Sequence, residues 1–312
     1  MITLRYHLVS LVAVFLALTI GVVLGSTSVS QRLLSVVAGD RSNLTEQVDQ
    51  LSAQRDQLAA QQRTANAFGN SVAASVVKGR LSGRKVVLVV APDTDPVNRD
   101  ATRQLLADSG AAVTGELDLS DAILDPARAD TLRDLTTRLL PAGAQLPSTS
   151  DSGGLVGGLL GSVLLTPKPG TAASAPGQTG AALGGLVQAG FVRPGPAPAQ
   201  AQLVVVLSGG AEAGAYSAER AATLARIAGE LNRAGGGAVL AGTSGSETGT
   251  GAVGVARADS SISAKLSTVD DLQDASGRVA TVLALRERAD GRTGHYGSAS
   301  GAQGPIPGAT AG

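Results

Sequence analysis

The chain has 312 residues, with 25 basic and 25 acidic side chains and therefore a formal net charge of zero. This length suits one large domain or two modest ones. The absence of cysteine excludes disulfides, thiolate metal sites, iron–sulfur clusters and a lipid-modified cysteine. The chain also lacks the basic stripe and the interleaved aromatic residues of nucleic-acid-binding proteins, so nucleic acid is not an expected partner.

Residues 1–29 are predicted to form an N-terminal membrane anchor. The stretch from Leu8 to Gly25 carries no charge and is long enough to cross a bilayer as a transmembrane helix. Arg5 precedes it and the next charged residue is Arg32, so the positive-inside rule places everything after the span outside the cytoplasm. A cleaved signal peptide is the alternative, although no Ala-x-Ala cleavage site follows the long apolar stretch.

Residues 30–80 are predicted to form a coiled-coil stalk. Apolar residues recur every seven positions, and a second seam position holds a mixture of apolar, Arg and Gln side chains. The first series is Val37, Leu44, Leu51 and Leu58, and the second is Leu34, Arg41, Val48, Arg55 and Gln62. This heptad pattern predicts a homo-oligomer of few strands. The alternative is a single amphipathic helix packed on the domain that follows.

Residues 81–297 are predicted to form an extracytoplasmic α/β domain. Continuous runs of β-branched residues are typical of strands that are buried on both faces. Helical patterns alternate with these runs, which predicts a mostly parallel sheet in a three-layer, Rossmann-like or flavodoxin-like arrangement. The expected strands are 84–92, 111–119, 201–210, 237–243 and, more weakly, 261–270.

The expected helices of this domain have recognisable ends. The segment 126–141 begins with proline in its first turn, and the segment 217–237 has Ser217 as a candidate N-cap and Gly235 as a candidate stop. Leu105 and Leu106 should face the core. The other expected helices are 97–109 and 276–291, the latter with Val279, Val282, Leu283 and Arg286 on one face.

Two segments interrupt or follow the alternation. Residues 141–200 form an insertion rich in Gly, Ala and Pro, with two weakly apolar pieces at 153–165 and 179–192. These pieces are predicted to pack as a helical hairpin on the sheet, joined by a disordered linker at 166–178; contact with a membrane is the alternative. Residues 298–312 are predicted to be a disordered tail.

The sequence contains few motifs of known catalytic or ligand-binding chemistry. The sequence contains no P-loop, no dinucleotide-binding fingerprint and no nucleophile elbow, so we expect no enzyme, no catalytic residue and no cofactor-binding residue. The strand ends carry Asp93, Asp95, Glu212 and Tyr216, where ligands of such folds bind. Asp93 and Asp95, with Asp100, could hold a hard cation, but acids in this position more often cap the following helix.

His295 is one of two histidines and lies between glycines near the C-terminus. A single imidazole without thiolates, thioethers or further imidazoles is a poor copper site, so no metal-binding residue is predicted. We expect Gly291 to end the last helix in a left-handed conformation and His295 with Tyr296 to dock against the sheet.

Several stretches resemble the actinobacterial copper-transporter family typified by MctB. They are the N-terminal "MITLRYHLVSLVAVFLALTIGVVLGS", the leucine heptads, "KVVLVVAP" and "STVDDLQDASGRVATVLALRERADGRTGHYG". The resemblance covers most of the chain to about Gly297 and is weakest at 141–200. It implies an outer-membrane protein of the cell envelope that forms a pore and lowers intracellular copper, with copper ions as the transported species.

Two hypotheses about function follow. The first is copper homeostasis by a single-pass, membrane-anchored protein that forms a pore as an oligomer. The second is a structural or interaction protein of the envelope, whose extracytoplasmic domain binds a partner and transports nothing itself.

Overall fold

The structure is a computed structural model that describes residues 4–166 and 176–308, with side chains in the first helix described for residues 6–25 and from 44 onward. The chain divides into two compact units, residues 1–65 and residues 66–312. We call the second the α/β unit. The predicted domain limits at residues 29, 80 and 297 stay predictions, and the linker residues 167–175 lie outside the described part.

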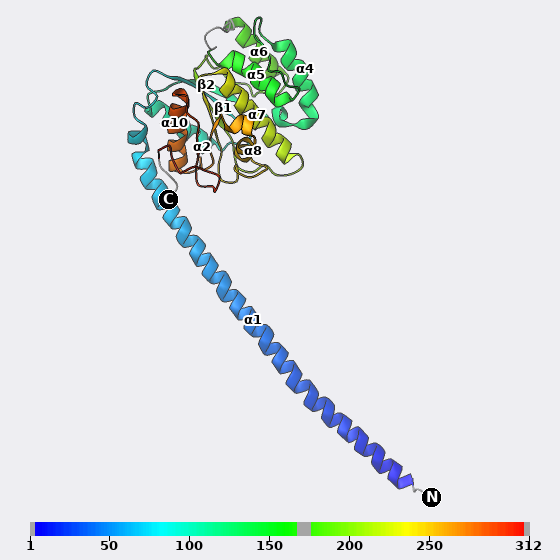
Figure 1. The fold of residues 1–312 in the computed structure, drawn as a ribbon. Coiled ribbons are helices and arrows are strands. Elements are labelled where there is room, and N and C mark those ends of the chain that lie inside the picture. Colours follow the sequence, from blue (N-terminus) through cyan, green and yellow to red (C-terminus); the bar gives the residue numbers. More distant parts are fainter. Residues whose placement is uncertain (1–3, 167–175, 309–312) are drawn as a thin grey trace. The chain divides into compact units, whose positions relative to one another are not determined.

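The first helix, α1, covers Leu4–Val77 (Figure 1). Its segment Tyr6–Gly25 has a mean hydropathy of 2.7, and it is the one span among the described residues that is long and apolar enough to cross a membrane. Further along, Leu44, Leu51 and Leu58 are exposed, each by more than 60%. The coiled coil stays a prediction, and its seam residues Leu34, Val37 and Arg41 lie outside the described side chains.

The α/β unit is built on a six-stranded parallel sheet in the order β2-β1-β3-β4-β5-β6. This confirms the predicted α/β class with a parallel sheet. β1 and β3 are buried along nearly their whole length, as their continuous β-branched runs predict. The strands are β1 Lys85–Val90, β2 Ala112–Asp118, β3 Leu203–Leu207, β4 Ala238–Ala241, β5 Ser267–Val269 and β6 His295–Tyr296.

Helices cover both faces of the sheet and make three layers (Figure 1). Alternate side chains of β1 point to opposite faces, so Val86 and Leu88 pack with one helix group while Val87 and Val89 pack with the other. The first group is α2 Pro96–Asp108, α10 Ala275–Ala289 and the last turns of α1. The second group is α3 Asp121–Leu124, α4 Ala129–Leu139, α5 Ser152–Leu164, α6 Pro176–Gln188, α7 Ser217–Ala234 and α8 Ala252–Ala258.

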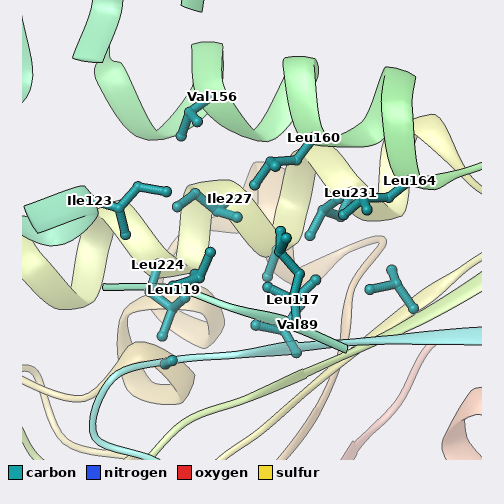
Figure 2. Close-up of a cluster of buried hydrophobic side chains, with 14 of the residues drawn as sticks. Val89, Leu117, Leu119, Ile123, Val156, Leu160, Leu164, Leu224, Ile227 and Leu231 are labelled. Carbon is teal, nitrogen blue, oxygen red and sulfur yellow. The ribbon is translucent and has the colours of Figure 1, made fainter. Parts of the chain in front are cut away.

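The predicted hairpin of residues 141–200 exists as α5 and α6, but α5 packs mainly on α7 rather than on the sheet. Figure 2 shows Val156, Leu160 and Leu164 of α5 above α7, with the sheet beyond it. Glycines spaced four apart allow this close approach: a Cβ on Gly157 would lie 3.0 Å from the Ile227 Cα, and one on Gly161 would lie 2.5 Å from the Ala234 Cβ. The apolar face of α5 is buried in protein, so it offers no surface to lipid.

Two local predictions are wrong. Most of the expected strand 261–270 is not extended, because the Asp259 carboxylate accepts the Ser261 N–H at 2.9 Å and starts a helical turn, α9 Ser260–Ser263. Tyr216, not Ser217, is the N-cap of α7, and it has the left-handed φ of 63°. On α10 the predicted face exists, with Val279 and Val282 buried, Leu283 half-buried and Arg286 exposed.

The described part of the C-terminal segment, residues 298–308, is hydrogen-bonded to the unit, in contrast to the predicted disordered tail. The Gln303 N–H donates to the His295 carbonyl at 2.7 Å, and Gly304 forms a parallel bridge with Tyr296. These bonds extend the sheet beyond β6 and give hydrogen-bond partners to backbone groups on the outer edge of that strand.

Candidate functional site

The carboxyl ends of the parallel strands form one edge of the sheet, and ligands of such folds bind there where the strand order reverses. In this sheet the reversal falls between β1 and β3, because β2 lies on one side of that pair and β4 to β6 lie on the other. The loops that follow β1 and β3 hold Asp93 and Glu212, as their positions in the sequence predict.

Ion pairs tie this reversal point to the neighbouring helices. The Arg220 Nε of α7 donates to the Glu212 carboxylate at 3.1 Å, and its Nη2 donates to the Asp121 carboxylate at 3.2 Å. Gly209 lies against Asp93, since a Cβ at this position would be 2.6 Å from the Asp93 Oδ2. Charged groups of the chain itself therefore lie at the reversal point.

Two of the three aspartates considered for a hard cation bind groups of the chain itself. Asp95 caps α2, because its carboxylate accepts the Val97 N–H at 2.7 Å. Helix capping is the predicted alternative to cation binding for these acids. Asp100 accepts a hydrogen bond from the Arg99 Nε at 3.1 Å. In the part of the chain that the structure describes, no three His, Cys, Asp or Glu side chains are grouped so that they could hold a metal ion.

A second group of polar residues lies where β5 and β6 end, and we call Arg257, Thr268, Asp270 and His295 the Arg257 cluster. The Arg257 guanidinium donates to the Asp270 carboxylate at 2.7 Å, to the Thr268 hydroxyl at 2.9 Å and to the Tyr296 carbonyl at 2.9 Å. Only 11% of the Arg257 side chain and 1% of the Asp270 side chain are exposed. This buried pair joins α8 to both strands.

Asp270 also holds the start of the C-terminal segment. Its Oδ1 accepts the N–H of Ser298 at 2.8 Å and of Ala299 at 3.1 Å. Gly297 makes this turn with a φ of 129°, and a Cβ there would collide with the Asp270 carboxylate. Glycine is therefore required at this position for both conformation and space.

The Arg257 cluster also holds the ring of His295. Because a guanidinium can only donate, the Thr268 hydroxyl accepts from Arg257, and its own proton is free to go to the His295 Nδ1, 2.9 Å away. The Ser263 backbone also interacts with the ring and by itself favours the protonated form. Burial, with the nearby Arg257 charge, lowers the pKa of His295, in agreement with a neutral ring.

This geometry confirms that His295 docks against the sheet, and Gly291 ends α10 with a left-handed φ of 83°. Tyr296 docks beside it: its hydroxyl donates to the Glu287 carboxylate at 2.5 Å, and burial raises the pKa of the phenol. The His295 ring contacts Thr268 and the Ser263 backbone within the protein, so it has a structural role.

We expect His295→Gln to fold and to lose about 1 kcal/mol of the free energy of unfolding, the usual net worth of a hydrogen bond. The lowered pKa has a further consequence. Below about pH 6.5 the histidine takes up a proton more easily in the unfolded chain than in the folded chain, so the free energy of unfolding falls as the pH drops. Glutamine does not titrate, so the variant should lack the share of this fall that His295 causes. Thermal unfolding at pH 7.5 and pH 5 checks both effects. A variant with unchanged acid sensitivity would contradict the neutral-ring assignment.

Asp271, next to the cluster, has an unusual environment. It is 3% exposed, its Oδ2 accepts the Ser276 hydroxyl at 3.3 Å, and none of the described residues donates to its Oδ1. Burial, together with the negative charge of Asp270, raises the pKa of Asp271 to about 6. The folded chain therefore holds this proton more tightly than the unfolded chain.

Stability should fall as the pH rises from about 4 to 6, by about 2–3 kcal/mol from Asp271 alone. The Asp271→Asn variant should lack this component and should be more stable than the parent protein at pH 7. Urea unfolding of both proteins across this pH range provides the measurement. Parallel stability curves for the two proteins would contradict the burial argument.

Sequence reasoning did not find Arg257, the centre of this cluster. It lies in "VARADS", where an arginine among small and polar residues reads as a surface side chain. Asp270 and His295 lie within the stretch that carries the family resemblance, and the structure brings both of them to Arg257. The cluster binds its own groups and has the chemistry of a structural lock.

Comparison with known proteins adds the remaining observation. The profile of the family described as "Copper transport outer membrane protein, MctB" matches residues 1–307. A protein named "Copper transporter MctB" from Mycobacterium tuberculosis (strain ATCC 25618 / H37Rv) is 37% identical over 308 residues, which cover 97% of this chain and 98% of that protein. A protein of the same name from Mycobacterium leprae (strain TN) is 35% identical over 314 residues, with 97% and 98% coverage.

Proposed function

Because the chain belongs to the MctB family of copper transport outer membrane proteins, we propose that it lowers the copper content of the cell as a single-pass envelope protein. The observation that carries the proposal is the extent of the similarity, which runs from the apolar span to the end of the α/β unit. We place the α/β unit outside the cytoplasm and the anchor in the outer membrane, with copper ions as the transported species.

Transport through a pore would require several copies of the chain. One helix cannot enclose an aqueous path, and Tyr6–Gly25 is the one candidate span of the described residues. The exposed Leu44, Leu51 and Leu58 support self-association, because isolated helices with such a stripe are marginal in water without a partner. We therefore propose that the stalk joins several copies and thereby brings their spans together.

A specific observation favours the second candidate, an envelope protein that acts by binding a partner. The span carries no charged side chain, whereas polar groups normally mark an ion path through a membrane. Conductance of planar bilayers separates the two candidates. A pore-forming protein gives stepwise currents with the full chain and none after removal of residues 30–65, and a partner-binding protein gives none with either.

The topology has its own test. A phosphatase that is active only outside the cytoplasm, fused after Ala67, should be active, because Arg5 before the apolar span favours export of everything that follows the span across the cytoplasmic membrane. The same fusion without residues 6–25 is the control and should be inactive at equal expression. An inactive full-length fusion at normal expression would contradict the placement of the α/β unit outside the cytoplasm.

A further inference from the structure

The last part of α1 lacks charge although much of it is exposed. Residues 64–77, "TANAFGNSVAASVV", contain no Asp, Glu, Lys, Arg or His. A helix at a protein surface normally carries charged residues on the side that faces water. One side of this segment needs none, since Ala73 and Val77 are buried in the α/β unit.

Polar contacts fix that buried side against α10. The Asn66 Oδ1 accepts the Ala275 N–H at 2.9 Å, and the Asn70 Oδ1 accepts from the Arg278 guanidinium at 2.8 Å. Gly69 lies so close that a Cβ would be 2.7 Å from that of Ala275. The orientation of residues 66–77 about their own axis is therefore determined within the unit.

A different side of the same segment is apolar and exposed. Phe68 is 69% exposed and Val76 is 40% exposed, and the half-buried Val72 lies midway between them. Steps of four residues place the three on one side of the helix, which we call the Phe68 face. In the described part of the α/β unit only two other large apolar residues, Val97 and Tyr216, are exposed.

Two residues of the Phe68 face, Val72 and Val76, lie on the repeat of the stalk, and Phe68 lies beside it. The seven-residue series of Leu44, Leu51 and Leu58 arrives next at Ala65 and Val72. The second series, which includes Val48, arrives first at Gly69, which packs on Ala275 within the unit, and then at Val76. Such a repeat is the pattern by which helices pair, and it persists into the α/β unit without an interruption in spacing.

We infer that the Phe68 face is the contact surface for the same face of a second copy of this chain, so that pairing extends from the stalk into the α/β unit. The inference rests on the proposed self-association of the stalk. Both copies enter one membrane with the same orientation, so their helices run parallel and each residue meets its counterpart near a two-fold axis. The lack of charge then avoids like-charge repulsion across that axis.

Single cysteines test the inference cleanly, because the natural chain has none. We compare Val72→Cys, Leu51→Cys and Ala74→Cys in the full-length protein in native membranes, using a short bis-maleimide. Ala74 is the matched control: it is exposed, and it lies two residues after Val72, about 200° further round the helix. Val72→Cys and Leu51→Cys should each give at least about fivefold more cross-linked dimer than Ala74→Cys. We expect this difference because residues 72 and 51 of the two copies would lie close to the two-fold axis, whereas residue 74 would point away from it.

Each other result has a defined meaning. Dimer from Leu51→Cys, with Val72→Cys at the level of Ala74→Cys, would overturn the inference and leave the stalk pairing intact. No dimer from Leu51→Cys or Val72→Cys would remove both the self-association and the inference. Equal dimer from all three would reflect random collision and would overturn the inference. A Val72→Cys adduct with a different protein would assign this face to another partner.

Discussion

Replacement of Arg257 with leucine is expected to lower the free energy of unfolding by about 3 kcal/mol, the lower end of the range for breaking a buried ion pair. The change leaves the Asp270 carboxylate buried without its cation, and it removes donors from Thr268 and the Tyr296 carbonyl. The Ser298 and Ala299 N–H groups still bind Asp270, which is why we expect the lower end. Urea unfolding of the detergent-solubilised full chain provides the measurement.

Two further variants make this result specific. Arg286→Leu removes an exposed arginine, paired with Asp290 at 3.1 Å, and should cost less than about 1 kcal/mol. Adding Asp270→Asn to Arg257→Leu should cost less than the sum of the single changes, because it neutralises the stranded carboxylate. Equal losses for Arg257→Leu and Arg286→Leu would show that the cluster does not lock the strands.

Gly157→Ala is expected to destabilise the protein by about 1–3 kcal/mol, the usual cost of overpacking. The new methyl carbon would lie 2.8 Å from the Glu230 Cβ and 3.0 Å from the Ile227 Cα, so α5 would have to move away from α7. That movement would also loosen the leucines that Figure 2 shows between the two helices. Thermal unfolding gives the measurement.

The same substitution at Gly184 of α6 should have the opposite sign. No atom lies within 4 Å of a Cβ placed there, so alanine adds helix propensity without a clash. We expect a gain of about 0.4–1 kcal/mol. If both alanine variants were stabilised, the glycines of α5 would not be needed for its contact with α7.

Much of the sheet could be predicted from sequence because its strands are buried on both faces. Runs such as "KVVLVV" leave little doubt about a central parallel strand, and β1 and β3 lie where these runs predict. β5 is harder, because it has three residues and a helical turn starts just before it at Asp259. Its partner β6 has only two residues, too few for any periodic pattern.

The Arg257 cluster was beyond the reach of sequence reasoning for a different reason. Its ion pair joins α8 to β5, and its hydrogen bonds reach β6 and the C-terminal segment, so it depends on tertiary contacts. The contact of α5 with α7 is similar. Glycine-rich sequence reads as flexible loop, whereas here the glycines provide the close approach of two helices. The family, by contrast, was recognisable from sequence and is confirmed by the comparisons.

Cell-associated copper is the measurement that tests the proposed function most directly. A strain that lacks this protein is grown in copper-supplemented medium, and its metal content is measured by mass spectrometry with zinc as the control metal. We expect the strain to accumulate more copper than its parent, with zinc unchanged. The full-length chain should restore the parental copper level, whereas a chain without residues 6–25 should not. Equal copper content in the deletion strain and its parent would contradict a role in copper homeostasis.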